Sequence, residues 1–147
     1  MRSAVLLTVV LAGRAPAQRP GVIEFGAGGL ATFASSDFAG AALSVARRSG
    51  QGRVAAVIAG GGTGEGAALR AEATAQFVLN AGARRGVTLY GAAGVAYLGA
   101  RGSRGRGYLT LFLGVEGAAA RPRGWFLEAG FGGGARVALG LRWRRPA

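Results

Sequence analysis

The chain has 147 residues, of which half are apolar and 29 are glycine, and its 18 basic residues outnumber six acidic ones for a formal charge of +12. This length suits a single domain with one core. The chain has no histidine, which removes the usual general base and the commonest metal ligand, and no cysteine, so it offers no disulfide framework. We therefore expect no catalytic centre, no metal site and no cofactor.

The amino terminus has the pattern of a secretory signal peptide. Arg2 precedes an apolar run at 4–12, and the Ala-Pro-Ala of residues 15–17 matches the cleavage site of such peptides. The apolar run is too short for a transmembrane helix. We predict that a signal peptide over 1–17 is removed, leaving one β-barrel domain over 18–147. A buried amino-terminal strand is the alternative interpretation.

The rest of the chain alternates between apolar and polar side chains. In 67–79 every odd position is apolar, and the even positions include Arg70, Glu72, Thr74 and Gln76. A period of two predicts a β-strand with one apolar and one polar face. Repeats of this pattern predict eight strands, at 21–33, 38–46, 53–59, 67–79, 87–98, 108–117, 125–132 and 135–143. The stretch 60–66 is predicted to be a loop because five of its residues are glycine.

These strands are joined by short connections, and no helical pattern lies between them. An even number of antiparallel strands with hairpin links can close on itself, which removes both edges of the sheet. We therefore predict an all-β fold, an eight-stranded antiparallel up-and-down β-barrel.

The apolar faces of the last five strands carry no charge. One Arg facing lipid at mid-bilayer costs about 2–4 kcal/mol, so this absence favours an outward apolar face in contact with lipid and a transmembrane barrel. Aromatic residues are expected to form a belt at each rim: Phe33, Tyr97 and Phe131 at one, and Phe25, Phe77, Trp125 and Trp143 at the other. The alternative is a water-soluble secreted barrel of the lipocalin type, with the apolar face turned inward.

The signal peptide, the eight alternating strands and the last strand together resemble the small eight-stranded outer-membrane β-barrels of the OmpA type. In that family a Gly followed three residues later by an aromatic in the last strand is an assembly signal, and Gly140 and Trp143 match these positions. The tail 144–147 departs from the family, whose members more often end on the aromatic itself. The resemblance implies insertion by the barrel-assembly machinery into the outer membrane of a Gram-negative-type envelope.

Charged residues on the polar faces are expected to form a structural network inside the barrel. Its predicted members are Glu24, Glu116, Glu128, Arg142, Arg70, Glu72 and Arg136. The first four are expected near the end that holds both chain termini, with Arg142 as the one cation assigned to three carboxylates. Buried carboxylates need such partners.

Catalysis is the alternative interpretation of these carboxylates, because a carboxylate pair can in principle hydrolyse a substrate. The small outer-membrane barrels that are enzymes centre their chemistry on His, which this chain lacks. We therefore expect no enzyme.

Eleven further Arg, Arg48 and Arg144 among them, are predicted in turns, where they can pair with the phosphates of outer-membrane lipids. The loop 99–107 is basic and glycine-rich, but a secreted chain rarely meets RNA, so no nucleic-acid partner is expected. The sequence favours a structural role in the envelope. A ligand-binding or narrow-channel transport barrel, and a soluble secreted binder, are the alternatives.

Overall fold

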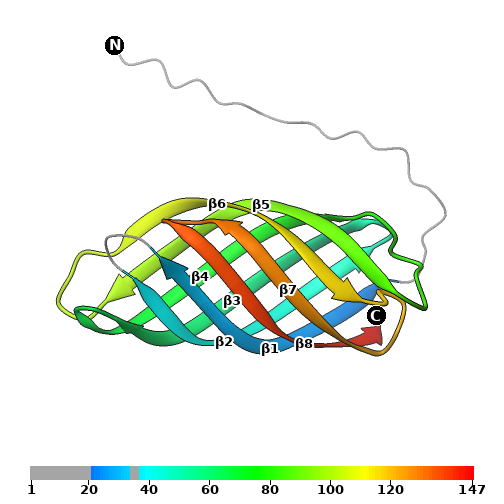
Figure 1. Cartoon of the computed structure of the whole chain (residues 1–147), viewed down its shortest axis with the longest axis horizontal. Helices are drawn as coiled ribbons and strands as arrows, with labels where there is room; N and C mark the ends of the chain where they lie inside the picture. The colour runs from blue at the N-terminus through cyan, green and yellow to red at the C-terminus, as the bar shows by residue number, and fades with distance from the viewer. Residues whose placement is uncertain (1–20, 34–36) are drawn as a thin grey trace, which may run out of the picture.

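The computed structural model describes residues 21–33 and 37–147, so the predicted signal peptide lies outside the described residues. This part of the chain forms one closed β-barrel (Figure 1). No helix in it is long and apolar enough to cross a membrane. The strands are β1 (Val22–Phe33), β2 (Phe38–Ser49), β3 (Gly52–Thr63), β4 (Gly66–Val78), β5 (Val87–Ala100), β6 (Arg106–Gly117), β7 (Arg123–Phe131) and β8 (Ala135–Pro146).

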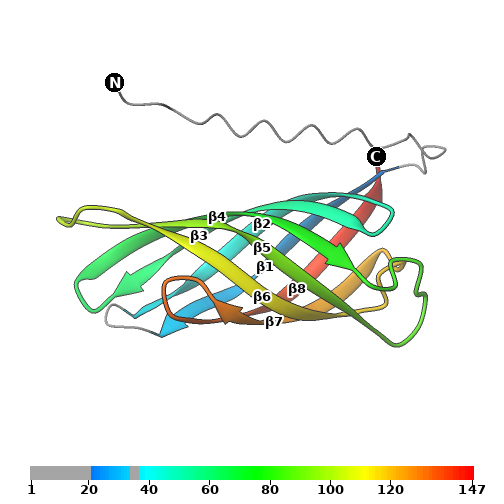
Figure 2. The ribbon, with the colours of Figure 1, turned by 90° about the horizontal axis from the view of Figure 1, so that it is seen from above.

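Each strand pairs antiparallel with its neighbours in sequence, and β1 pairs with β8 to close the barrel. The prediction of an eight-stranded antiparallel up-and-down barrel is confirmed. Val22 at the start of β1 pairs with Pro146 at the end of β8, so β1 begins where β8 ends. We call this the terminal end and the opposite one the distal end; they lie at right and left in Figure 1, and Figure 2 shows the same barrel from above.

Most of the strands reach further than the sequence predicts, whereas β1 begins one residue later than predicted and β4 and β7 each end one residue earlier. The prediction of a loop at 60–66 is wrong for its first part, because β3 continues to Thr63 and Gly61 pairs with Gly40 on β2. A Cβ on Gly61 would lie 2.7 Å from the carbonyl carbon of Ala39. This glycine therefore lets two strands approach closely, which is a second reason for glycine besides a turn.

Side chains alternate between the two faces of the sheet. On β6, Leu109, Leu111 and Leu113 are more than half exposed, whereas Thr110 and Phe112 between them are buried. The same alternation turns most of the large apolar side chains of the other strands outward. The predicted outward apolar face is confirmed, and the inward apolar face that a lipocalin-like barrel requires is wrong for the described residues.

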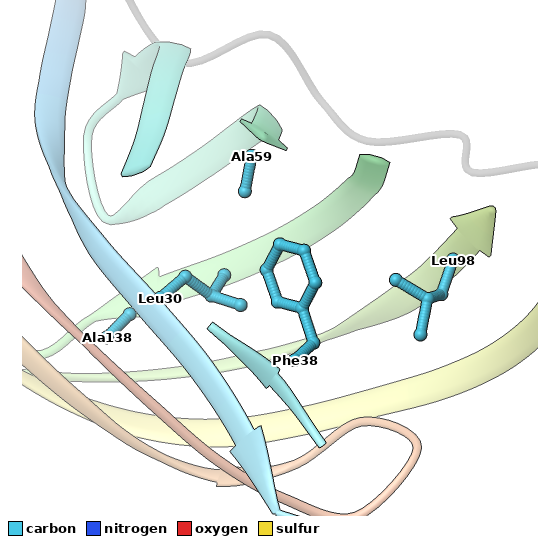
Figure 3. Close-up of a cluster of buried hydrophobic side chains, with 5 residues drawn as sticks. All are labelled: Leu30, Phe38, Ala59, Leu98 and Ala138. Carbon is cyan, nitrogen blue, oxygen red and sulfur yellow. The ribbon is translucent and has the colours of Figure 1, made fainter. Parts of the chain in front are cut away.

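Apolar clusters and charged side chains fill the interior. One cluster, Leu30, Phe38, Ala59, Leu98 and Ala138, occupies the distal half (Figure 3). A second packs Val78, Tyr90, Ala92, Phe112 and Ala119 toward the terminal end. A lumen filled in this way is expected of eight strands.

Gly140 lies opposite Gly28 on the seam between β1 and β8. A Cβ on Gly140 would lie 2.8 Å from the Cα of Gly28 and 2.9 Å from a ring carbon of Phe126. Gly140 therefore has a packing role in closing the barrel, whatever it contributes to assembly.

Gly140→Ala should destabilise the barrel by about 1–3 kcal/mol, because the added methyl overpacks this seam. Gly60→Ala is the matched control, since a Cβ on Gly60 meets nothing within 4 Å; its effect should stay within about 0.5 kcal/mol. Urea unfolding of both variants measures the difference. Equal stabilities would mean that the seam relaxes to admit the methyl group.

Candidate functional site

The structure places the predicted network residues inside the barrel and brings them together through ion pairs. All seven are buried: Glu24, Glu72, Glu116, Glu128, Arg70, Arg136 and Arg142. They form two groups joined near the middle of the lumen. The buried arginines that the sequence analysis did not place inside the barrel belong to the group nearer the terminal end.

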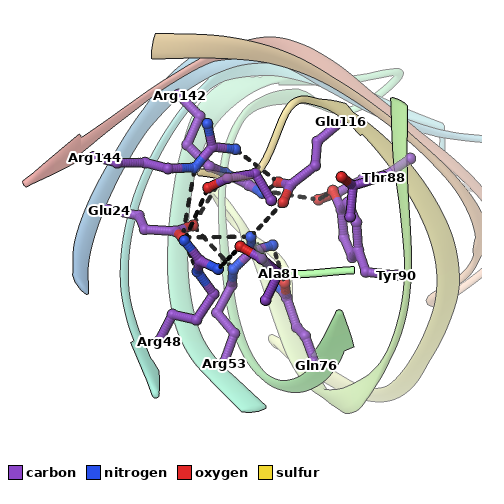
Figure 4. Close-up of polar contacts among 12 residues, drawn as sticks. Glu24, Arg48, Arg53, Gln76, Ala81, Thr88, Tyr90, Glu116, Arg142 and Arg144 are labelled. Atoms are coloured by element: carbon purple, nitrogen blue, oxygen red, sulfur yellow. Dashed lines mark hydrogen bonds and ion pairs between the residues drawn. The ribbon is translucent and has the colours of Figure 1, made fainter. Parts of the chain in front are cut away.

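The terminal cluster consists of Glu24, Glu116, Arg48, Arg53, Arg142 and Arg144 (Figure 4). The carboxylate of Glu24 lies 2.8 Å from Nε of Arg48 and 2.9 Å from Nε of Arg53. The carboxylate of Glu116 accepts a hydrogen bond from Arg142 and lies 2.7 Å from Nη2 of Arg53 and 3.1 Å from Nη2 of Arg144. Two carboxylates therefore share four guanidinium groups.

The expectation that Arg142 is the one cation for three carboxylates is wrong. Arg48 and Arg144 lie in β2 and β8 rather than in turns, and both side chains point into the barrel. Continuing the alternation from Ala46 by two residues would have found Arg48, and continuing it from Arg142 would have found Arg144. Arg53 gives no such signal, because its strand is apolar on both faces.

The distal cluster consists of Glu72, Glu128, Arg70 and Arg136. The carboxylate of Glu72 lies 2.7 Å from Nε of Arg70 and 2.8 Å from Nη2 of Arg136. The carboxylate of Glu128 lies 2.9 Å from Nη1 of Arg136. Arg70 also donates to the carbonyl oxygen of Gly132, at 2.8 Å. Two carboxylates here face two guanidinium groups, so the charges balance.

Tyr90 and Arg142 connect the two clusters. The Tyr90 hydroxyl donates to Glu128 at 2.6 Å, and the Arg53 guanidinium lies 5.1 Å from the centre of the Tyr90 ring. Arg142 reaches from the terminal cluster to within 3.7 Å of Glu128. A cavity of about 30 Å³ between the clusters has room for about one or two water molecules.

Every buried carboxylate of the described residues is matched by at least one guanidinium group. An ionised carboxylate held in this way only accepts hydrogen bonds, and arginine does not give up its proton in proteins. The arrangement is therefore typical of a structural ion network and gives no support to hydrolysis by a carboxylate pair.

Two connections fold over the mouth of the barrel at the terminal end. The backbone N–H of Ala120, after β6, donates to the carbonyl oxygen of Ala83, after β4, at 2.9 Å. The buried side chain of Arg48 binds both connections. It donates hydrogen bonds to the carbonyl oxygens of Ala81, at 2.8 Å, and Ala119, at 2.9 Å. Arg48 thus links this cover to Glu24 inside the barrel.

The distal mouth holds a pocket lined mostly by polar side chains. This pocket of about 480 Å³ lies between the β3–β4 and β5–β6 connections, lined by Glu65, Ser103, Arg104, Arg106 and Tyr108 among others. The basic loop predicted at 99–107 is shorter in the structure, because β5 extends to Ala100 and β6 begins at Arg106.

No protein-family model matches this chain, and no curated protein matches it.

Proposed function

We propose that the chain is a small outer-membrane β-barrel protein with a structural role in the envelope and no catalytic turnover. The observation that carries this proposal is the placement of charge on the barrel wall. Among the described strands, every exposed charged side chain lies at a strand end or within two residues of one: Arg47, Arg106, Arg123 and Arg145. Between these rims the outward surface is apolar, as contact with lipid requires.

The dimensions of the strands support the proposal. At about 3.3 Å per residue and a tilt of about 40°, a 12-residue strand such as β1 spans about 30 Å, enough to cross the apolar band of about 25 Å on a membrane barrel. Aromatic side chains are exposed near both ends, as expected of residues at the two membrane–water interfaces: Phe33, Tyr97 and Phe131 near the distal end, and Phe25, Phe77, Trp125 and Trp143 near the terminal end.

Export and insertion complete the proposal. The sequence pattern of residues 1–17 supports secretion, and the spacing of Gly140 and Trp143 supports recognition by a barrel-assembly machinery that delivers the chain to the outer membrane. Trp143 is partly exposed on β8 beside Phe25 of β1, so it also fits the aromatic belt. Outer-membrane lipids are then the partners of the apolar wall.

Cell fractionation tests the proposal. The full-length protein, expressed with its own amino terminus, should reach the outer-membrane fraction and should migrate differently on a gel before and after heating, because the folded barrel resists detergent. A protein found only in a soluble fraction would contradict the membrane assignment.

The alternative of a narrow channel finds less support. In the described part of the chain, two connections cross the terminal mouth, and apolar clusters and ion pairs occupy the lumen, which disfavours a water-filled channel. In planar bilayers we therefore expect the reconstituted protein to give no discrete conductance steps. Steady steps that scale with the amount of protein would favour the channel instead.

A further inference from the structure

The exposed charges differ between the two ends of the barrel. Nine Arg of the described residues are exposed, and six of them lie at the terminal end: Arg47, Arg84, Arg85, Arg121, Arg123 and Arg145. The exposed acidic side chains of the described residues, Asp37 and Glu65, both lie at the distal end. The acidic side chains near the terminal end are buried in the terminal cluster, where arginines already surround them. The terminal rim is therefore strongly positive on its outer surface.

The strand register brings part of this charge close together. Arg47 on β2 and Arg145 on β8 both lie opposite Ile23 of β1, so they are separated by one strand, or about 10 Å. Arg123 on β7 lies opposite Trp143 of β8. The six arginines make no ion pair within the described part of the chain.

Aromatic side chains lie next to two of these arginines, on the side toward the middle of the barrel wall. Trp125 follows Arg123 by two residues on the same face, and Trp143 precedes Arg145 in the same way. Phe25 pairs with Trp143 across the seam, and all three rings are at least one-third exposed. Along β7 and β8, from the middle of the barrel wall toward the terminal end, apolar side chains are followed by aromatic rings and then by guanidinium groups.

We propose that this terminal rim, formed by the six arginines, binds the headgroups of anionic phospholipids. The inference rests on the proposed membrane location and adds the partner and the end of the barrel that meets it. Aromatic rings prefer the membrane–water interface, so the arginines just beyond them are level with lipid phosphates. A guanidinium group forms paired, charge-assisted hydrogen bonds with phosphate, and a negatively charged lipid surface attracts each basic residue further. The distal rim, where acidic side chains accompany three arginines, should show much less preference.

Spin-labelled lipids measure this preference directly. The full-length protein is reconstituted into phosphatidylcholine bilayers that contain a trace of spin-labelled phosphatidylglycerol or spin-labelled phosphatidylcholine, and electron paramagnetic resonance gives the fraction of each held at the protein surface. The rim variant is Arg47→Gln/Arg123→Gln/Arg145→Gln. The matched control is Arg101→Gln/Arg104→Gln/Arg106→Gln, which removes the same charge from exposed positions at the distal end.

We expect the wild type to favour phosphatidylglycerol by about threefold or more, and the preference to fall as salt is added. The rim variant should lose most of this preference for phosphatidylglycerol, and the distal variant should keep the preference. A wild type without preference would overturn the proposal, even if a variant failed to fold. Equal losses in both variants would also overturn it, because net charge alone would then be responsible. Failure of the wild type to enter any bilayer would instead refute the proposed membrane location.

Discussion

Glu116→Gln is expected to destabilise the barrel by about 3–5 kcal/mol, the usual cost of removing one partner from a buried ion group. Glu116 is fully buried and faces Arg53, Arg142 and Arg144. With glutamine in its place, four guanidinium groups of the terminal cluster would share the single carboxylate of Glu24. The amide is close in shape to the carboxylate, so the loss reports charge rather than packing.

Arg142→Met should lower the free energy of unfolding less than Glu116→Gln does. Without Arg142, Glu116 still has two arginine partners and Glu24 still has three. The double variant should lose less stability than the two single variants lose in total, because it removes one charge of each sign. Urea unfolding of the folded protein measures all three, with Glu65→Gln in the exposed β3–β4 turn as control. A Glu116→Gln variant as stable as that control would show that the cluster does not depend on its carboxylates.

Leu111→Arg is expected to cost about 2–4 kcal/mol if the barrel wall faces lipid, because the charge would lie near the middle of the bilayer. Leu111 is in the middle of β6 and is 62% exposed. Leu79→Arg is the matched control: the same substitution, at a similarly exposed outward leucine just beyond the end of β4. At that rim the cost should fall to about 0–1 kcal/mol.

Folding yields into liposomes, followed by urea titration, compare the two leucine variants. In a water-soluble barrel both arginines would be solvated, and both variants would fold as well as the wild type. A large loss for Leu111→Arg alone therefore separates a wall in lipid from a wall in water.

The short connections predict the antiparallel order of the strands, and the absence of charge from the apolar faces predicts that these faces point outward. Period-two alternation predicts the number of strands. It succeeds in β4 and β6 because one face there carries nearly all of the polar groups. It fails in β3, where both faces are apolar and Arg53 has no pattern around it. The glycines at 60–62 were also misjudged, because glycine serves a close strand approach as well as a loop.

The ion network was only partly predictable, because partners within it come from strands far apart in sequence. Arg136 on β8 reaches Glu72 on β4 across the lumen, a distance in sequence of 64 residues. Local pattern places such side chains inward but does not choose their partners, which depend on how the strands stagger when the barrel closes. The predicted strands 38–46 and 135–143 end before Arg48 and Arg144, so the alternation along them does not reach these two inward side chains.

Single nitroxide labels test directly whether the outward face of the barrel contacts lipid. The chain has no cysteine, so one cysteine at a time at Leu109, Leu111 or Leu113 gives a unique label on the outward face of β6. A label at Glu65 in the distal turn is the control. In the reconstituted protein, we expect labels at Leu111 and Leu113 to collide often with oxygen, which dissolves in the bilayer, and seldom with a water-soluble nickel complex. The label at Glu65 should show the reverse. Nickel collisions at Leu111 and Leu113 as frequent as those at Glu65 would contradict contact between the outward face and lipid.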